Sequence, residues 1–566
     1  MNNRLVTGDY LVFIIYFLIV SSYGYWIYRR KKKKVTDTHD FFLAEGSLTW
    51  WAIGASLIAS NISAEQFIGM SGNGFFVGIA VSAYEWIAAL ALVIVAIGFM
   101  PVYLKNKIFT MPQFLKTRYN ETVSLIMTIF WLFLYVFVNI TSIMYLGALA
   151  INNLAGGQHL HLIMVCLALF AIIITLGGMK VIGYTDVIQV MVLIIGGLAT
   201  TYMALITVSE KFGLGRDVLK GFQELLRDAP DHFHMILQKP GAAAGQSQID
   251  KYLILPGIAM YFAGQWIINL NYWGCNQYIT QRALGANLPT ARTGILFAAL
   301  LKLMMPIIVM LPGIAAYVLY QHGALHAEMN SAGKFNQDNA YSSMLGFLPG
   351  GLKGLSVAAL TAAIVASLAG KANSISTIFT LDIFKKYMRR EASEGEMVWV
   401  GRFTILVAMF LSVAFTWTDL LGISGEGGFT FIQKYTGYIS PGIFAMFILG
   451  MFWKRTTGAA AVAGLVTGVL LMVVFSNYAP SWFGTDTALY TAYINDKGVY
   501  EIPFMISMGW SFFFTVLVMV LISFLGPRLN PKAFALDREM FRLQPSHIVL
   551  ICAIILILMA LYIRFW

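Results

Sequence analysis

The chain reads ASLIASNISAEQFIGMSG from Ala55 to Gly72. Both ends of this stretch are apolar, but its middle is polar from Ser60 to Gln66. The whole apolar run is long enough to cross a bilayer, where an unpaired backbone group costs several kcal/mol. A polar interruption inside such a run must therefore line a cavity or lie buried in protein. We expect a helix that is broken near Asn61 and enclosed by other helices.

The composition supports a membrane protein. Of the 566 residues, 58% are apolar and only 11% are charged, against about 25% charged in an ordinary soluble domain. Soluble, disordered and outer-membrane barrel proteins are excluded, because the apolar runs are continuous rather than alternating. The net charge of +11 comes from basic residues in short loops, which orient helices in a membrane, and does not indicate nucleic-acid binding.

The apolar runs predict an all-α polytopic protein with fourteen transmembrane helices. The first is followed by Arg29, Arg30 and the lysines of 31–34, an order typical of an anchor whose N-terminus lies outside. An even number of spans then places both termini on the extracellular or periplasmic side. The expected spans are 9–28, 47–72, 76–104, 119–153, 159–175, 179–208, 251–275, 290–320, 345–383, 397–418, 425–453, 457–476, 503–525 and 545–566.

A second polar interruption is expected in the seventh span, from Asn269 to Gly274. The two broken spans each open a group of five, and five is odd, so the second group is inserted upside-down relative to the first. Broken helices at matching places in two inverted halves indicate the midplane binding site of a secondary transporter. The expected parts are an N-terminal helix and basic loop (1–46), a first repeat (47–208), an outer loop with an amphipathic helix (209–250), a second repeat (251–476) and C-terminal helices (477–566).

Polar and charged side chains inside the spans are the next candidates. Glu85 and Lys302 lie within apolar runs, where a charge is unfavourable by roughly 2.5–3.5 kcal/mol unless it has a partner, and Gln433 adds a third polar group at the start of the eleventh span. They therefore pair with one another, with water or with a substrate. Asp186 either caps the sixth span or lines an ion route to the cytoplasm. Lys371 receives no role from the sequence.

The ninth span is rich in small residues from Ala362 to Gly370, which lets another helix backbone approach closely. Ser367 would offer a hydroxyl at that contact, opposite the backbone carbonyls of Ala59 and Ile62 in the broken second span. Such an oxygen-only site with no net charge suits Na⁺. Small-residue packing without an ion is the alternative that the residues leave open.

Three motifs are similar to those of the sodium/solute symporter family: Ala55 to Gly72, then Tyr272-Trp273-Gly274 with Asn276-Gln277-Tyr278, and the segment Ser374 to Phe384. The resemblance runs from about residue 40 to the end of the chain. It implies a LeuT-type core of two inverted five-helix repeats, alternating access and Na⁺-coupled uptake of a sugar.

The resemblance also implies roles for individual residues. The sugar contacts fall on Gln66, Glu85, Asn269, Lys302 and Gln433. The inner gate falls on Tyr272 beside Trp273, steadied by Asn61, and the outer gate on Met70, Tyr84 and Phe429. The sodium ligands fall on the carbonyls of Ala59, Ile62 and Ala363 and the hydroxyl of Ser367, and the acid on the ion route falls on Asp186.

Two positions depart from the family pattern. Ala366 stands where a second serine hydroxyl would serve sodium, and Ala88 stands where a serine would contact the sugar. The sodium affinity and the choice of hexose are therefore left undecided.

The sequence thus predicts a plasma-membrane (inner-membrane) symporter that carries Na⁺ and a neutral hexose, galactose or glucose. Gln, Asn, a carboxylate and an ammonium can pair with sugar hydroxyls, which both donate and accept. Another neutral solute such as myo-inositol is the alternative, followed by a sugar uniporter, channel or sensor. An enzyme is not expected, because all eight histidines lie in loops or at span edges. Nucleic acid is not expected as a partner, and the oligomeric state stays open.

Overall fold

The computed structural model describes residues 5–30, 41–42, 48–155, 157–241, 243–331, 334–417 and 428–566. The chain forms two compact units, each assembled from segments that lie far apart in the sequence. The first unit comprises Met1–Ile79, Met127–Phe233 and Gln277–Phe429, and the second comprises Ala80–Ile126, His234–Asn276 and Thr430–Trp566. Each unit therefore takes helices from both of the expected repeats.

The first unit holds most of the long helices. Its main elements are α1 (Thr7–Arg30), α3 (Trp50–Asn61), η2 (Glu65–Met70), α4 (Ser71–Phe76), η5 (Leu134–Ile140), α9 (Thr141–Leu154), α10 (Leu160–Thr175), α11 (Met179–Lys211), α12 (Val218–Asp228), η6 (Pro230–Phe233), α16 (Gln277–Leu284), α17 (Leu288–Gln321), β1 (Asn330–Ser331), β2 (Lys334–Phe335), η7 (Gln337–Asn339), α18 (Ala340–Leu345), α19 (Leu352–Ile378), η8 (Phe379–Met388) and α20 (Glu394–Thr416). α8 (Glu121–Phe133) joins the two units in sequence.

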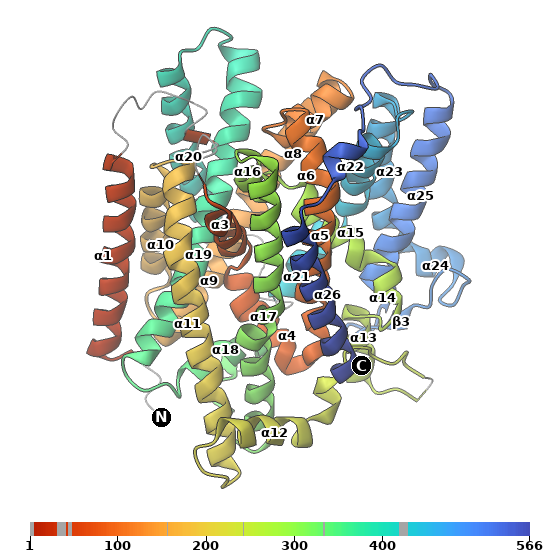
Figure 1. Ribbon diagram of the computed structural model, residues 1–566. Helices are drawn as coiled ribbons and strands as arrows, with labels where there is room; N and C mark the ends of the chain where they lie inside the picture. The colour runs from red at the N-terminus through yellow and green to blue at the C-terminus, as the bar shows by residue number, and fades with distance from the viewer. Residues whose placement is uncertain are drawn as a thin grey trace. The chain divides into compact units, whose positions relative to one another are not determined.

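Helix α3 forms the centre of the first unit. It packs against α11, α17 and α19, and α11 and α19 lie side by side (Figure 1). Every residue of α3 from Ala52 to Asn61 is buried, and so are nearly all residues of α19. A helix whose side chains are apolar or small on every face can be buried on all sides in this way.

The break in the second span is confirmed. α3 ends at Asn61, Ile62 is extended (φ −76°, ψ 119°), and the chain resumes as the π-helical turn η2 at Glu65. The polar residues of the sequence pattern thus lie where the backbone leaves the helix, with α3 packed on α11, α17 and α19 and η2 packed on α9, α17 and α18.

The amphipathic helix expected near Asp217 is α12, which runs crosswise to the end of α11 (Figure 1). The Asp217 side chain accepts hydrogen bonds from the backbone N–H groups of Leu219 and Lys220, so it caps the helix. Gly221 faces α11 so closely that a Cβ atom would lie 2.0 Å from the carbonyl oxygen of Leu205. Glycine is the residue that allows this contact.

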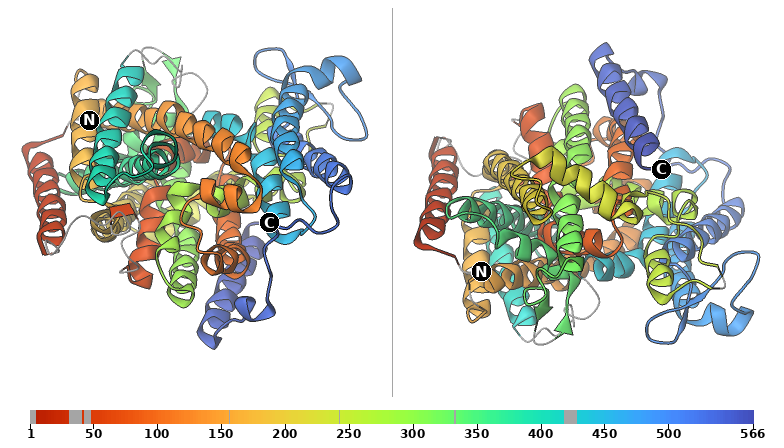
Figure 2. Two further views of the ribbon diagram at one scale, coloured as in Figure 1. Left: turned by 90° about the horizontal axis from the view of Figure 1, so that it is seen from above. Right: turned by 90° about the horizontal axis from the view of Figure 1, so that it is seen from below.

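The second unit has shorter and more strongly bent helices. Its elements are η3 (Ile79–Ser82), α5 (Ala83–Ile94), η4 (Val95–Phe99), α6 (Met100–Lys105), α7 (Met111–Arg118), α13 (Gln246–Ile254), α14 (Ala259–Phe262), α15 (Gly264–Cys275), α21 (Gly428–Gly437), α22 (Ser440–Phe452), α23 (Gly458–Val473), η10 (Val474–Tyr478), α24 (Ala479–Phe483), β3 (Tyr493–Ile494), β4 (Tyr500–Glu501), α25 (Phe504–Phe524), η11 (Arg538–Phe541) and α26 (Pro545–Phe565). α15 packs against α5, α22 and α25, and Figure 2 gives two further views of these helices.

The predicted break at 269–274 is wrong in its position. These residues lie inside the continuous helix α15, and the chain bends instead by 81° just before it, between Phe262 and Gly264. Asn269 Nδ2 donates to the Gln265 carbonyl (2.9 Å) and Asn271 Nδ2 donates to Ser440 Oγ (3.1 Å), while Asn271 Oδ1 is buried without a hydrogen-bond partner among the described residues. The amide N–H groups of both asparagines are thus paired although the backbone stays helical.

Within the described part of the chain, ten helices are long and apolar enough to cross a membrane, or up to eleven if the bent pair forms one span. The shorter apolar helices α10 and α22 and the broken second span fall below that length. The chain is therefore a multi-pass membrane protein, while the number fourteen is not confirmed.

Candidate functional site

The break after α3 frees two backbone carbonyl oxygens that would each accept a hydrogen bond in a regular helix. In an α-helix the carbonyl of Ala59 would accept from the N–H of Ser63, and that of Ile62 from the N–H of Gln66. Here the Ser63 N–H donates to Gln66 Oε1 (2.9 Å), and the Gln66 N–H donates to the Ser63 carbonyl (3.2 Å). Both expected carbonyl ligands of sodium have therefore lost their usual helical donors.

The same hydrogen bonds hold the side-chain oxygen of Gln66 against the break. Its Oε1 accepts from the backbone N–H of Ser63 and from Ser63 Oγ (3.0 Å), so this oxygen closes the break. Sequence reasoning had assigned Gln66 only to the sugar, whereas the structure shows that it also shapes the backbone.

Ser367 of α19 lies against this break. Its hydroxyl donates to the carbonyl oxygen of Ser60 at 3.1 Å, which joins α19 to the last turn of α3. Ala59, Ile62, Ala363 and Ser367 are all buried in the first unit. The structure thus brings together the segments that carry all four expected sodium ligands, with one hydroxyl and several carbonyls as the available donors.

Lys371 lies one turn further along α19. Its ammonium donates to Ser367 Oγ (2.9 Å) and lies 4.4 Å from the ring centroid of Tyr278. The side chain is only 3% exposed. This lysine has no role in the sequence-based prediction, but its ammonium donates directly to the hydroxyl expected to bind sodium.

Asp186 belongs to a second buried network. Ser56 Oγ donates to Asp186 Oδ2 (2.5 Å), and Arg282 Nε donates to Ser56 Oγ (2.9 Å) and to the Ser56 carbonyl (3.2 Å). Arg282 Nη1 also donates to the carbonyl of Tyr278. A buried acid and a buried base thus share one serine between α11, α3 and α16.

The capping alternative for Asp186 is therefore wrong, because α11 begins at Met179 and Asp186 lies two turns inside it. Asp186 is completely buried and Arg282 is 1% exposed. Arg282 lies between the expected spans 251–275 and 290–320, where the sequence predicts a loop, whereas every residue of α16 is buried. An acid inside a span requires a partner, but the sequence contains too many basic residues to select this one.

The expected sugar contacts divide between the two units. Gln66 and Lys302 belong to the first unit, where Lys302 is buried in α17, and α17 packs against η2. Glu85, Asn269 and Gln433 belong to the second unit.

In the second unit, α5 carries Tyr84 and Glu85 and packs against α15, which carries Asn269, Tyr272 and Trp273. The rings of Tyr272 and Trp273 lie 5.2 Å apart. The helix α5 thus places one expected gate residue and one expected sugar contact against the helix that carries the expected inner-gate residues.

The expected outer-gate residues are also divided between the two units. Met70 and Phe429 belong to the first unit, where a Cβ on Gly69 would lie 2.5 Å from Phe429 Cβ. Phe429 therefore packs directly on the turn that carries Met70. Asn61 lies at the end of α3 in the same unit, and Tyr84 lies in the second.

Gln265 is a buried polar residue that the sequence reasoning missed. It lies one turn before Asn269 on α15, and neither its Oε1 nor its Nε2 has a hydrogen-bond partner among the described residues. Gln265 follows Ala263 and Gly264 and precedes Trp266, and no motif or hydrophobic period in the sequence marks it. The two departures from the family pattern, Ala88 and Ala366, are both fully buried.

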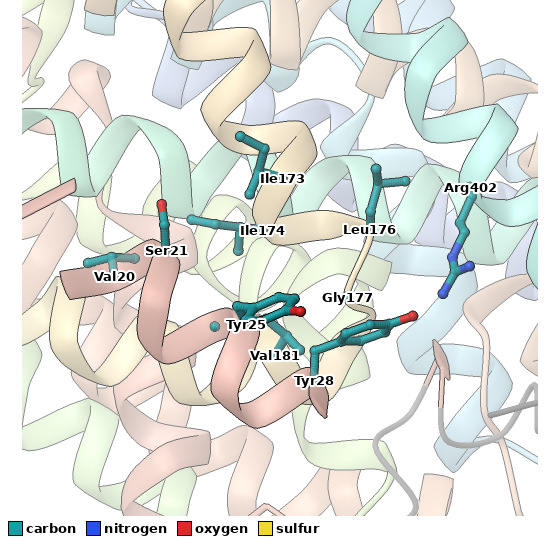
Figure 3. A pocket seen from close by; sticks show the side chains of 11 residues that line it. Val20, Ser21, Tyr25, Tyr28, Ile173, Ile174, Leu176, Gly177, Val181 and Arg402 are labelled. Carbon is teal, nitrogen blue, oxygen red and sulfur yellow. The ribbon is translucent and has the colours of Figure 1, made fainter. Parts of the chain in front are cut away.

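A separate cavity of about 260 Å³ opens between α1, α10, α11 and α20 (Figure 3). Tyr25 and Tyr28 of α1 and Arg402 of α20 face it, and its other walls are mainly apolar. None of the expected sugar, gate or sodium residues lines this cavity.

A buried, broken helix with freed carbonyls, closed against a small-residue helix, is the arrangement of a secondary membrane transporter. The model of the Sodium:solute symporter family matches residues 41–468. The chain therefore belongs to the sodium:solute symporter family.

Relatives and a solved structure agree with this assignment. The chain is 41% identical to the sodium/glucose cotransporter of Vibrio parahaemolyticus over 99% of this chain and 98% of that protein. It is 34% identical to the human sodium/myo-inositol cotransporter 2, over 84% of this chain and 70% of that protein. The structure of a Na⁺-coupled sialic acid symporter matches with a TM-score of 0.74 at 21% identity, over 93% of this chain and 99% of that one, which shows a shared LeuT-type fold.

Proposed function

We propose that the chain couples the inward movement of Na⁺ to the uptake of a neutral hexose, glucose or galactose, across the plasma membrane. The relative of 41% identity is a sodium/glucose cotransporter that aligns over almost the whole chain. The observation that carries the proposal is the pair of carbonyls, Ala59 and Ile62, released from helical hydrogen bonding beside the Ser367 hydroxyl. Oxygen ligands without net charge suit a hard monovalent cation.

In this mechanism Na⁺ binds first, from outside, to the carbonyls of Ala59, Ile62 and Ala363 and the hydroxyl of Ser367. Binding orders the break between α3 and η2, and η2 carries Gln66. The ion thereby prepares one of the sugar contacts, because Gln66 and the break share hydrogen bonds. Asp186 lies on the route by which the ion leaves.

The sugar then binds to Gln66, Glu85, Asn269, Lys302 and Gln433. The donors and acceptors of these side chains match hydroxyl groups, each of which donates and accepts. Met70, Tyr84 and Phe429 close the outer side, and Tyr272, supported by Trp273 and Asn61, later moves aside to release the sugar inward. In this proposal 47–208 and 251–476 are the inverted repeats, and both termini lie outside.

The membrane potential and the sodium gradient together supply enough free energy to accumulate the sugar in the cell. A membrane potential of ~100 mV contributes about 2.3 kcal/mol per charge, and a roughly tenfold sodium gradient adds about 1.4 kcal/mol. One Na⁺ per sugar would then sustain an accumulation on the order of several hundredfold.

The deciding experiment is uptake of labelled glucose and galactose into proteoliposomes, with an inward Na⁺ gradient and with K⁺ in place of Na⁺. We expect Na⁺-dependent accumulation above equilibrium. Equal, merely equilibrating flux in both salts would instead identify a uniporter or channel, and binding without flux would identify a sensor.

A second candidate substrate is myo-inositol, because a relative of 34% identity is a sodium/myo-inositol cotransporter and Ala88 replaces a sugar-contacting serine. Labelled myo-inositol in the same vesicles distinguishes the two polyols. Uptake of myo-inositol in preference to both hexoses would overturn the hexose assignment and leave Na⁺ coupling intact.

A further inference from the structure

Lys371 supplies a positive charge at the place where sodium is expected. Its ammonium donates to Ser367 Oγ at 2.9 Å, and the Ser367 hydroxyl in turn donates to the Ser60 carbonyl at 3.1 Å. A hydroxyl oxygen has two acceptor sites. One is taken by the ammonium, and a sodium ion on the other would lie next to a like charge.

The charges around this point are already balanced without sodium. Glu65 of η2 and Arg282 of α16 are the charged groups that act on Lys371. Arg282 is itself engaged with Ser56, whose hydroxyl donates to Asp186. The cluster thus holds two basic and two acidic side chains. An entering Na⁺ adds a positive charge that no further acidic side chain of the cluster compensates.

Glu65 offers a place to which the ammonium can move. Its Oε1 is buried and accepts no hydrogen bond from the part of the chain that the structure describes. Glu65 begins η2 and directly precedes Gln66. The Tyr278 ring lies 4.4 Å from the ammonium and attracts a cation in this region.

We propose that Lys371 is a built-in competitor of sodium: its ammonium holds Ser367 until Na⁺ displaces it toward Glu65. This inference rests on the proposed sodium site and deepens it. It makes Lys371 a specificity-determining residue that weakens sodium binding. The absence of a second hydroxyl at Ala366 acts in the same direction, since the site has fewer oxygen atoms with which to displace the lysine.

The displacement also links the ion to the sugar. While Lys371 holds Ser367, Glu65 is left without a hydrogen bond to Oε1. Once Na⁺ takes Ser367, the ammonium joins Glu65 and fixes the start of the turn that carries Gln66. Sodium occupancy is thereby transmitted to a sugar contact through one side chain of α19.

The test is direct binding of radioactive Na⁺ to the purified full-length protein, a measurement independent of transport. Lys371→Met removes the charge and keeps the length of the side chain. We expect this variant to bind Na⁺ at least about tenfold more tightly than the parent, because a like charge at hydrogen-bond distance disfavours a second cation. Lys371→Gln gives a second neutral variant should the methionine variant fold poorly.

Three control variants separate the effect from general loss of a buried lysine. Lys371→Arg keeps the charge and should leave the sodium affinity weak. Lys353→Met removes another buried lysine of the same helix, about 27 Å away along the helix axis at 1.5 Å per residue, and should leave the affinity unchanged. Ser367→Ala combined with Lys371→Met should abolish the gain.

Unchanged or weaker Na⁺ binding in both neutral variants would overturn the inference. If sugar uptake by the parent were still Na⁺-dependent, the proposed function would stand and only the role of Lys371 would fall. If neither the parent nor the neutral variants bound Na⁺ and sugar uptake ignored it, both would fall. Measuring both Na⁺ binding and sugar uptake therefore shows whether the proposed function fails or only the role of Lys371.

Discussion

Replacing Arg282 by methionine should be one of the most damaging single changes in the first unit. The guanidinium donates through Nε to the Ser56 hydroxyl (2.9 Å) and carbonyl (3.2 Å), and through Nη1 to the Tyr278 carbonyl. It is also the main positive charge acting on Asp186, which is completely buried. Methionine fills a similar volume, so the loss comes from the charge and hydrogen bonds rather than from a cavity.

The size of the effect follows from the uncompensated acid. Arg282 compensates Asp186 through the shared Ser56 hydroxyl, and removing a charge that compensates a buried acid destabilises a protein by about 3–5 kcal/mol. The unfolding entropy is about 2.1 cal/mol/K per residue, or about 1.2 kcal/mol/K for 566 residues. The midpoint of thermal unfolding should therefore fall by roughly 3–4 °C.

The assay is the fraction of purified, detergent-solubilised protein that stays monodisperse after heating at a fixed rate. The rate must be fixed, because membrane proteins unfold irreversibly and the midpoint depends on it. Arg402→Met is the matched control, since Arg402 is half-buried and its Nε has no hydrogen-bond partner among the described residues. Its midpoint should stay within about 1 °C of the parent.

The double variant Arg282→Met with Asp186→Asn tests the reasoning most sharply. If the acid and the base stabilise one another, the double variant should be less damaged than the sum of the single variants by about 0.5–3 kcal/mol. Full additivity, or an Arg282→Met midpoint equal to that of the parent, would refute the shared network.

Three further predictions concern the site itself. Gln66→Ala and Lys302→Ala should each reduce sugar binding at least tenfold while the protein still folds, as equilibrium binding and gel filtration would show; normal uptake in both would remove them from the sugar site. Ala366→Ser should tighten the sodium affinity by adding an oxygen ligand, measured as the Na⁺ concentration for half-maximal uptake, and no change would mean that the site is complete without it. Gly370→Ala should cost about 1–3 kcal/mol, because its Cβ would lie 2.4 Å from Arg282 Nη2, and a thermal midpoint equal to the parent's would contradict this packing.

The sequence by itself determined the membrane class, the family and the place of the first break. These features depend on local or nearly local properties: the length of apolar runs, the polar stretch from Ser60 to Gln66, and motifs that follow one another in the chain. The amphipathic helix after Asp217 was predictable for the same reason, because its cap and its apolar face lie within a few residues.

Only the tertiary structure decided which distant side chains meet. The sequence placed the second break at 269–274, but these residues stay helical in α15, where Asn271 donates to Ser440, and the bend lies at Ala263. It assigned Arg282 to a loop and gave Lys371 no role, whereas folding buries both beside Ser56 and Ser367. Buried charges pair with side chains that are close in space but far apart in the sequence. No hydrophobic period or short motif in the sequence indicates which side chains will pair.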